Sequence, residues 1–397
     1  MVRRALILKL FEAFSIQRWN DHIRPVLLCE MDKTAHKMII AYCLSRYQED
    51  AGHAVDWHNL IRGGIFELLR RVVLSDIKSP VYRKIRATNP EVFHQLSRWV
   101  YEQLSESVAG TSFQADLREY LTREDSLDAE TNHLLTAAHI FASYWEFRII
   151  KQLHQDDLHV HEIEQGMLRD LEPYLDLPGM RKIMTQAPIA AFIDLAGKLR
   201  FQIRWSTTPR VPQTSVLGHS MMVACLTYFF STEIGACPRR IRNNFFGGLM
   251  HDLPESVTRD IISPVKRAVP GLSEIISGIE REMVAAEIHP LLEPAWIEEL
   301  TYLTENEFTS KILTDGRIKL VSSNEISASF NHDSFNPIDG EIIKIADDLA
   351  AYVEAFHSIE AGLNTPTLAQ GVQGIREKYR GKTIAGINIG SIYADFA

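Results

Sequence analysis

The sequence predicts an all-α fold, and three observations carry this prediction. Helix-breaking residues are sparse, with 21 Gly and 16 Pro in 397 residues. Runs that alternate apolar and polar residues, as half-buried strands do, are few. Apolar residues instead recur three or four positions apart, for example over 222–229 and 343–353. That spacing places an apolar stripe along one side of a helix.

The elements expected along the chain are helices separated by polar turns. Residues 1–14 combine a basic start with an apolar stretch that is interrupted by Lys9 and Glu12, and they contain no small-residue cleavage site. We therefore expect a first amphipathic helix there rather than a signal peptide. A polar stretch from about 155 to 166 is the expected linker, and turns are expected at 207–209, 236–238 and 331–333.

The composition argues against several classes of protein. Hydrophobic residues make up 46% and charged residues 23%, which is an ordinary globular balance and not that of a disordered chain. The net charge is −9, from 42 Lys+Arg against 51 Asp+Glu, and no basic block is present, so we expect no stable nucleic-acid binding. No run of about 18 apolar residues predicts a membrane span. The four cysteines form no CxxC pair, so a reducing cytoplasm is the expected location.

An internal repeat is the main feature of the chain's organisation. Residues 63–81 and 247–265 align without gaps at an offset of 184, and nine of these 19 positions are identical. An Arg-Trp pair and then a histidine precede each copy: Arg18, Trp19 and His36 in the first, and Arg204, Trp205 and His219 in the second. The period is too long for a solenoid array. We therefore expect two diverged copies of one helical domain.

The second copy carries the residue types of a metal site on three expected helices. His219 opens one helix, His251 and Asp252 close another, and Asp347 lies in a third. Imidazole and carboxylate groups together suit a divalent transition metal. Adjacent helical residues diverge by about 100°, so His251 and Asp252 can share an ion only near a helix end. Pro254 predicts such an end, because the residue before a proline is pushed out of α geometry.

These motifs resemble those of the HD-domain metal-dependent phosphohydrolase superfamily. Finer features are similar to bacterial HD-type 5′-deoxynucleotidases over about residues 195–360. They are an Arg-Trp pair 15 residues before the first histidine, HisAspxxGlu at 251–255, Asp260, SerProValLys at 263–266 and LysIleAlaAspAspLeuAlaAlaTyr at 344–352. The resemblance implies two tandem HD-domain-like helical bundles and hydrolysis of a nucleoside monophosphate.

The resemblance also implies a role for each matching side chain. One divalent ion (Mn, Co, Fe, Ni, Zn or Mg) would be held by His219, His251, Asp252 and Asp347. Glu255, together with Asp252, would act on the attacking water. On the substrate side, Arg204 and Lys266 would meet the phosphate, Asp260 would contact the sugar 3′-hydroxyl, and Trp205 would crowd the 2′ position and favour deoxyribose.

The first copy is expected to lack the metal. It has Glu67 and Leu68 where the second has the His-Asp pair, and Ala138 falls opposite Asp347. We expect residues 1–165 to be a degenerate HD-like domain and residues 166–397 to carry the intact site. A vestigial site made by His36, Glu67 and His139 stays open. Single-copy relatives self-associate, so the resemblance implies an internal pseudo-dimer, and a homodimer stays open as well.

Other functions compete with the nucleotidase prediction. The same site would suit another phosphorylated nucleotide, namely a dNTP, guanosine tetraphosphate or a cyclic dinucleotide. A regulatory nucleotide-binding protein with a silent second domain is a further alternative, although the intact ligand set argues against it. A two-iron oxygenase would need more ligands between His251 and Asp347, for which His289 and His332 are candidates outside any ligand motif.

Overall fold

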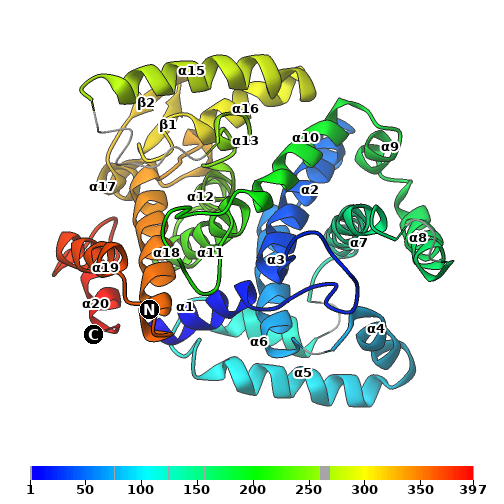
Figure 1. The fold of residues 1–397 in the computed structure, drawn as a ribbon. Helices are drawn as coiled ribbons and strands as arrows, with labels where there is room; N and C mark the ends of the chain where they lie inside the picture. Colours follow the sequence, from blue (N-terminus) through cyan, green and yellow to red (C-terminus); the bar gives the residue numbers. More distant parts are fainter. Residues whose placement is uncertain (1, 76, 124–125, 155–157, 260–268, 397) are drawn as a thin grey trace.

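The predicted all-α fold is confirmed in a computed structural model (Figure 1), which describes every residue except 1, 76, 124–125, 155–157, 260–268 and 397. The α-helices are α1 (Arg4–Phe11), α2 (Glu30–Asp50), α3 (Trp57–Val73), α4 (Ser79–Thr88), α5 (Pro90–Ser105), α6 (Gln114–Thr122), α7 (Ala129–Lys151), α8 (Leu158–Leu171), α9 (Pro178–Met184), α10 (Pro188–Lys198), α11 (Val216–Glu233), α12 (Pro238–Met250), α13 (Glu255–Thr258), α15 (Leu272–Glu287), α16 (Pro294–Thr304), α17 (Ser323–Glu325), α18 (Gly340–Glu360), α19 (Pro366–Tyr379) and α20 (Ile389–Ala394). Shorter helical turns are η1 (Glu12–Phe14), η2 (Glu172–Tyr174), η3 (Leu199–Phe201), η4 (His289–Leu291), η5 (Ile326–Phe330) and η6 (Asp333–Phe335).

The helices begin where the sequence supplies a cap or a proline. Ser215 caps α11 by accepting a hydrogen bond from the backbone of Gly218, and Asp339 caps α18 in the same way from Ile342. Proline stands in the first turn of α5, α10, α12, α16 and α19, where its missing N–H costs nothing. The first turn of each helix that carries the site is therefore fixed by its own sequence.

Helix α11 lies at the centre of the molecule. Every residue from Val216 to Ser231 is buried, so the helix is covered on all sides. It packs against α12 and α18 on one side and against α2, from the first half of the chain, on the other (Figure 1). A single hydrophobic cluster accordingly contains residues of both halves.

The structure differs from the expected linker. Residues 158–166 are not an irregular connection but the first part of α8. The following helices α9 and α10 pack back against α2, so the chain reaches the second half along the surface of the first.

Strand structure among the described residues is confined to one hairpin. Strands β1 (Lys311–Thr314) and β2 (Arg317–Leu320) pair antiparallel. They are joined by Asp315 and Gly316, both with positive φ (51° and 71°), as a tight hairpin turn requires. None of the described helices is both long and apolar enough to cross a bilayer.

Candidate metal centre

Three helices bring the expected ligands together. His219 lies in the first turn of α11, His251 follows the last residue of α12, and Asp347 lies midway along α18. Gly248 on α12 makes this possible, because a Cβ there would stand only 3.3 Å from the backbone of Ala224 on α11. The close approach of the two helices sets His251 beside His219.

The ligand atoms converge as a metal site requires. One atom each from His219, His251 and Asp347 lie within 4.8 Å of one another. Nε2 of His219 is 3.0 Å from Oδ1 of Asp347. Nδ1 of His251 is 2.8 Å from the backbone oxygen of Gly248, so its Nε2 is turned towards the cluster. Two imidazoles and a carboxylate are the donor set of a divalent transition metal.

Asp252 lies beside this cluster. Its Oδ2 lies 3.1 Å from Nε2 of His251 and 3.6 Å from a guanidinium nitrogen of Arg204. The carboxylate of Asp252 therefore lies between His251 and Arg204. The residues that converge, His219, His251 and Asp347, fit a divalent ion, and Asp252 stays the fourth ligand that the resemblance implies.

The charge states of the ligands reflect their mutual proximity. Burial of the His251 imidazole tends to lower its pKa, but the negative charge of the neighbouring Asp252 carboxylate raises the pKa of His251 to about 9. Burial likewise favours protonation of the carboxylates, but His219 and Lys344 hold the pKa of Asp347 well below its usual range. His251 in turn lowers the pKa of Asp252. Both carboxylates are therefore ionised and able to hold a cation.

Glu354 is a functional residue that sequence reasoning missed. Its Oε1 lies 3.1 Å from Nδ1 of His219, and its Oε2 accepts a hydrogen bond of 2.8 Å from the indole of Trp205. A carboxylate on the far nitrogen of a ligating histidine fixes the ring orientation and its tautomer. Glu354 stands seven residues after Asp347 on α18, and this spacing of two helical turns is the signal that indicates it.

Arg204 lies beside Asp252, and both Arg204 and Trp205 contact Glu354. Nε of Arg204 is 3.5 Å from Oε2 of Glu354, and Arg210 supports the loop by donating to the backbone oxygen of Arg204. Trp205 has a φ of 55°, so the chain turns sharply at this point. This turn brings the side chains of Arg204 and Trp205 to the same carboxylate, that of Glu354.

The remaining expected residues have varied positions. Glu255 begins α13 and is half-buried, and its backbone oxygen accepts from the side chain of Gln202. Asp348 pairs with Lys378 and Tyr379. Asp260 and Lys266 lie outside the described residues.

The first half does not contain the vestigial site considered from the sequence. Nε2 of His36 is 2.9 Å from the backbone oxygen of Ile193, and its Nδ1 is 3.3 Å from a guanidinium nitrogen of Arg200. Glu67 instead bonds to Arg70 and Tyr120. His139 contacts Lys33. Each of His36, Glu67 and His139 is therefore bound to a different partner, and the three do not converge on one point.

The comparisons with known proteins agree with this geometry. No curated protein matches the chain. A family model described as HD domain matches residues 196–376, a range that contains His219, His251, Asp252 and Asp347. HD domains are typically metal-dependent hydrolases. Residues 196–376 of this chain are therefore similar to the HD domain, and the three converging ligands lie within the similar part.

Proposed function

We propose that the HD domain of this protein is a metal-dependent 5′-nucleotidase that releases phosphate from deoxynucleoside monophosphates. The observation that carries the proposal is the position of Arg204, 3.6 Å from the ligand Asp252. A phosphate gripped by this guanidinium would lie directly beside the metal ligands. Arginine suits this task because its planar fork binds two phosphate oxygens at once.

The chain's own residues divide the work of hydrolysis. A bound divalent ion would supply a water of lowered pKa and offset charge on a phosphate oxygen. Arg204 would orient the phosphate, held in place by Glu354 and by the turn at Trp205. Glu255, at the start of α13, would pass a proton to the leaving sugar oxygen. Trp205 would lie against the sugar and disfavour a 2′-hydroxyl, as in the enzymes that the motifs resemble.

Phosphate release from a panel of substrates tests the proposal. Ribo- and deoxyribonucleoside mono- and triphosphates, guanosine tetraphosphate and cyclic dinucleotides would each be assayed with Mn²⁺, Co²⁺, Fe²⁺, Ni²⁺, Zn²⁺ and Mg²⁺. We expect phosphate from deoxynucleoside monophosphates, loss of turnover with a chelator and its return with added metal. Release of triphosphate or pyrophosphate instead would assign a different HD-type activity.

Variants connect the activity to the site. His219→Ala and Asp252→Ala should abolish turnover because each removes a ligand. Arg204→Ala should raise KM for the monophosphate. His332→Ala is the matched control, because His332 is exposed and bonds to Ser334, outside the ligand cluster. Full activity in the ligand variants would contradict the proposal.

A further inference from the structure

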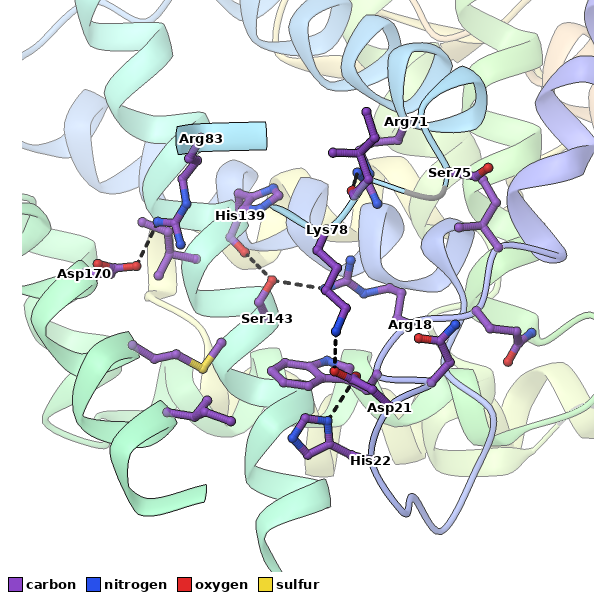
Figure 2. A pocket seen from close by; sticks show the side chains of 18 of the residues that line it. Arg18, Asp21, His22, Arg71, Ser75, Lys78, Arg83, His139, Ser143 and Asp170 are labelled. Carbon is purple, nitrogen blue, oxygen red and sulfur yellow. Dashed lines mark hydrogen bonds and ion pairs between the residues drawn. The ribbon is translucent and has the colours of Figure 1, made fainter. Parts of the chain in front are cut away.

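A cavity in the first half of the molecule lies outside the metal centre. Its volume is about 1100 Å³, slightly above the usual range for small-molecule sites. It is bounded by the segment 15–22, the end of α3, and helices α4, α7 and α8. Figure 2 shows Arg18, Arg71 and His139 directed into it.

The loop at one edge of the cavity repeats the backbone of the loop that carries Arg204. Gln17 pairs with Cys29 as an isolated antiparallel bridge, and Ile203 pairs with Ser215 in the same way. Trp19 has a φ of 54°, against 55° for Trp205. The two loops therefore make the same sharp turn at the same position.

The side chains of this loop also repeat the contacts of the second half. The indole of Trp19 donates to Oε2 of Glu146 at 3.0 Å, as Trp205 donates to Glu354 at 2.8 Å. Nε of Arg18 donates to the same oxygen of Glu146 at 2.8 Å. The arrangement of arginine, tryptophan and buried glutamate that borders the metal centre is thus present in both halves.

The positions of the metal ligands are filled differently. Nζ of Lys33 lies 2.6 Å from Nδ1 of His139, the contact that corresponds to His219 with Asp347. His139 therefore stands opposite Asp347, and the sequence prediction that Ala138 does so is wrong. Burial lowers the pKa of His139 well below its usual value and also that of Lys33, so the imidazole is neutral. The first half therefore has the amino group of Lys33 and a neutral imidazole where the second has the pair of His219 and Asp347.

The mouth of the cavity is lined by cations held in weak pairs. Lys78 pairs with Asp21 at 2.6 Å, and Arg83 pairs with Asp170 at 2.8 Å. All four side chains are 43–63% exposed, so solvent screens each pair and the pairs are weak. An incoming anion could replace either carboxylate. Deeper in, Arg71 donates to the backbone oxygen of Ile77 and is mostly buried.

Apolar side chains also line the cavity. They are Ile140 on α7 and Ile163 and Met167 on α8. A ligand that fits would have an anionic end for the arginines and a flat or apolar part for these side chains. A nucleoside monophosphate has both.

We propose that this cavity binds a nucleoside monophosphate without hydrolysing it, through Arg71 and Lys78, next to Arg18, whose guanidinium already pairs with Glu30 and Glu146 at 2.8 Å. The identification of the anionic group as a phosphomonoester rests on the role proposed for Arg204. The carboxylate and imidazole set that would hold a metal is replaced by Lys33, His139 and the apolar Leu68. The first half would therefore keep recognition and lack the means of turnover.

Binding to the full chain tests this proposal separately from activity. Calorimetric titrations would use the Arg204→Ala protein with a chelator, which removes both the metal and the phosphate grip of the second half. The probes are the four common ribo- and the four common deoxyribonucleoside monophosphates, the matching nucleosides and inorganic phosphate. We expect one site per chain for at least one monophosphate, and weaker binding of its nucleoside by tenfold or more.

Two variants assign that binding to the cavity. Arg71→Met and Lys78→Met, each added to Arg204→Ala, should weaken the monophosphate at least tenfold, and the exposed Lys78 position does not endanger folding. Arg380→Met is the control, because Arg380 is 78% exposed and pairs only locally with Glu377. No binding of any monophosphate, equal binding of its nucleoside, or binding unchanged in both variants would each overturn the proposal. A wild-type chain that releases no phosphate but shows this binding would refute the nucleotidase alone.

Discussion

Glu354 shows how one buried side chain can control a metal site that it does not enter. One carboxylate oxygen of Glu354 accepts a hydrogen bond from His219, and the other accepts one from the indole of Trp205. Glu354 therefore connects a metal ligand to the loop that carries Arg204 and Trp205. Although burial acts against ionisation, Arg204 and His219 keep the pKa of Glu354 low, so the carboxylate stays charged. Its negative charge makes the imidazole a stronger ligand.

Glu354→Gln should therefore weaken metal binding. Loss of an outer partner of this kind typically reduces metal affinity by about 10–100-fold. Calorimetric titration with Mn²⁺ or Co²⁺ would measure the change. Glu360→Gln, at the exposed end of the same helix, is the matched control and should leave the affinity unchanged. Equal affinities in the two variants would show that Glu354 is only structural.

A second prediction concerns the pH dependence of stability and follows from the burial of His36. Burial and Arg200 lower its pKa from 6.5 to about 3. Below pH 6.5 the unfolded chain therefore takes up a proton that the folded chain does not bind until about pH 3. The free energy of unfolding should fall as pH drops through this window, by up to about 1.4 kcal/mol per pH unit from this group.

Urea unfolding at several pH values compares the wild type with His36→Gln. The variant should show a shallower slope between about pH 4 and 6. Met38→Leu, a buried neighbour that does not titrate, should lower stability without changing the slope. Parallel curves for His36→Gln and the wild type would refute the assigned burial of an uncharged imidazole.

At this scale, the sequence predicted the second copy better than the first. His219, His251 and Asp347 were indicated by residue type and spacing, and the structure brings them together. In the first copy, matching by residue type selected His36, whereas Lys33 makes the corresponding contact. The reason is length: 34 residues separate Lys33 from Glu67, against 32 between His219 and His251. The first copy thus has two additional residues in this segment, and the sequence alone does not show where the structure accommodates them.

Helix α18 is the element on which the site depends most, because it carries both Asp347 and Glu354. Its start is fixed by the buried ion pair between Asp339 and Arg240 and by Gly340. A Cβ on Gly340 would overlap the backbone of Phe308 and Thr309. Backbone cannot rotate aside as a side chain can, so this position admits only glycine without a shift of the helix.

Gly340→Ala should destabilise the protein by about 1–3 kcal/mol, the usual cost of overpacking a buried site. Gly374→Ala is the control, since a Cβ there meets nothing within 4 Å and the residue lies in the exposed part of α19. That change should be neutral or stabilising by up to about 1 kcal/mol. Chemical denaturation measures both, and a stable Gly340→Ala protein would mean that α18 can shift freely.

The sequence predicted elements well where apolar residues are periodic and poorly where they are not. Helix α11 was expected from its apolar composition. Helix α8 was expected as part of a linker, because it buries only Val160 and Leu171 and its polar residues hide the period. The hairpin at Asp315 and Gly316 was not predicted, since its second strand is wholly exposed.

The whole molecule is held together by aromatic contacts between the halves. The rings of Phe113 and Phe229 stack with centroids 4.6 Å apart, and those of Tyr42 and Phe246 are 4.9 Å apart. Each buried phenylalanine contributes about 1.5–3 kcal/mol. The two predicted domains therefore share one interior, and their boundary near residue 165 stays a prediction about sequence history rather than about independent folding.

Residues 166–397 produced alone should not form a stable monomer. Without α2 and Phe113, the rings of Phe229 and Phe246 would be exposed to water, and we expect aggregation or strong binding of a hydrophobic dye. Size-exclusion chromatography would measure this, with co-expression of residues 1–165 as the control that restores a soluble complex. A monodisperse, cooperatively folded fragment would contradict the shared interior.

Arg200 bears on whether the two halves can be exchanged between proteins. It comes four residues before Arg204, yet its guanidinium is buried and donates to Glu146 of the first half at 2.9 Å. Removing one partner of such a pair costs about 3–5 kcal/mol, because the other charge is left in the interior. A chimera that joins this HD domain to a foreign amino-terminal half must therefore supply an anion at the position of Glu146, or replace Arg200 as well.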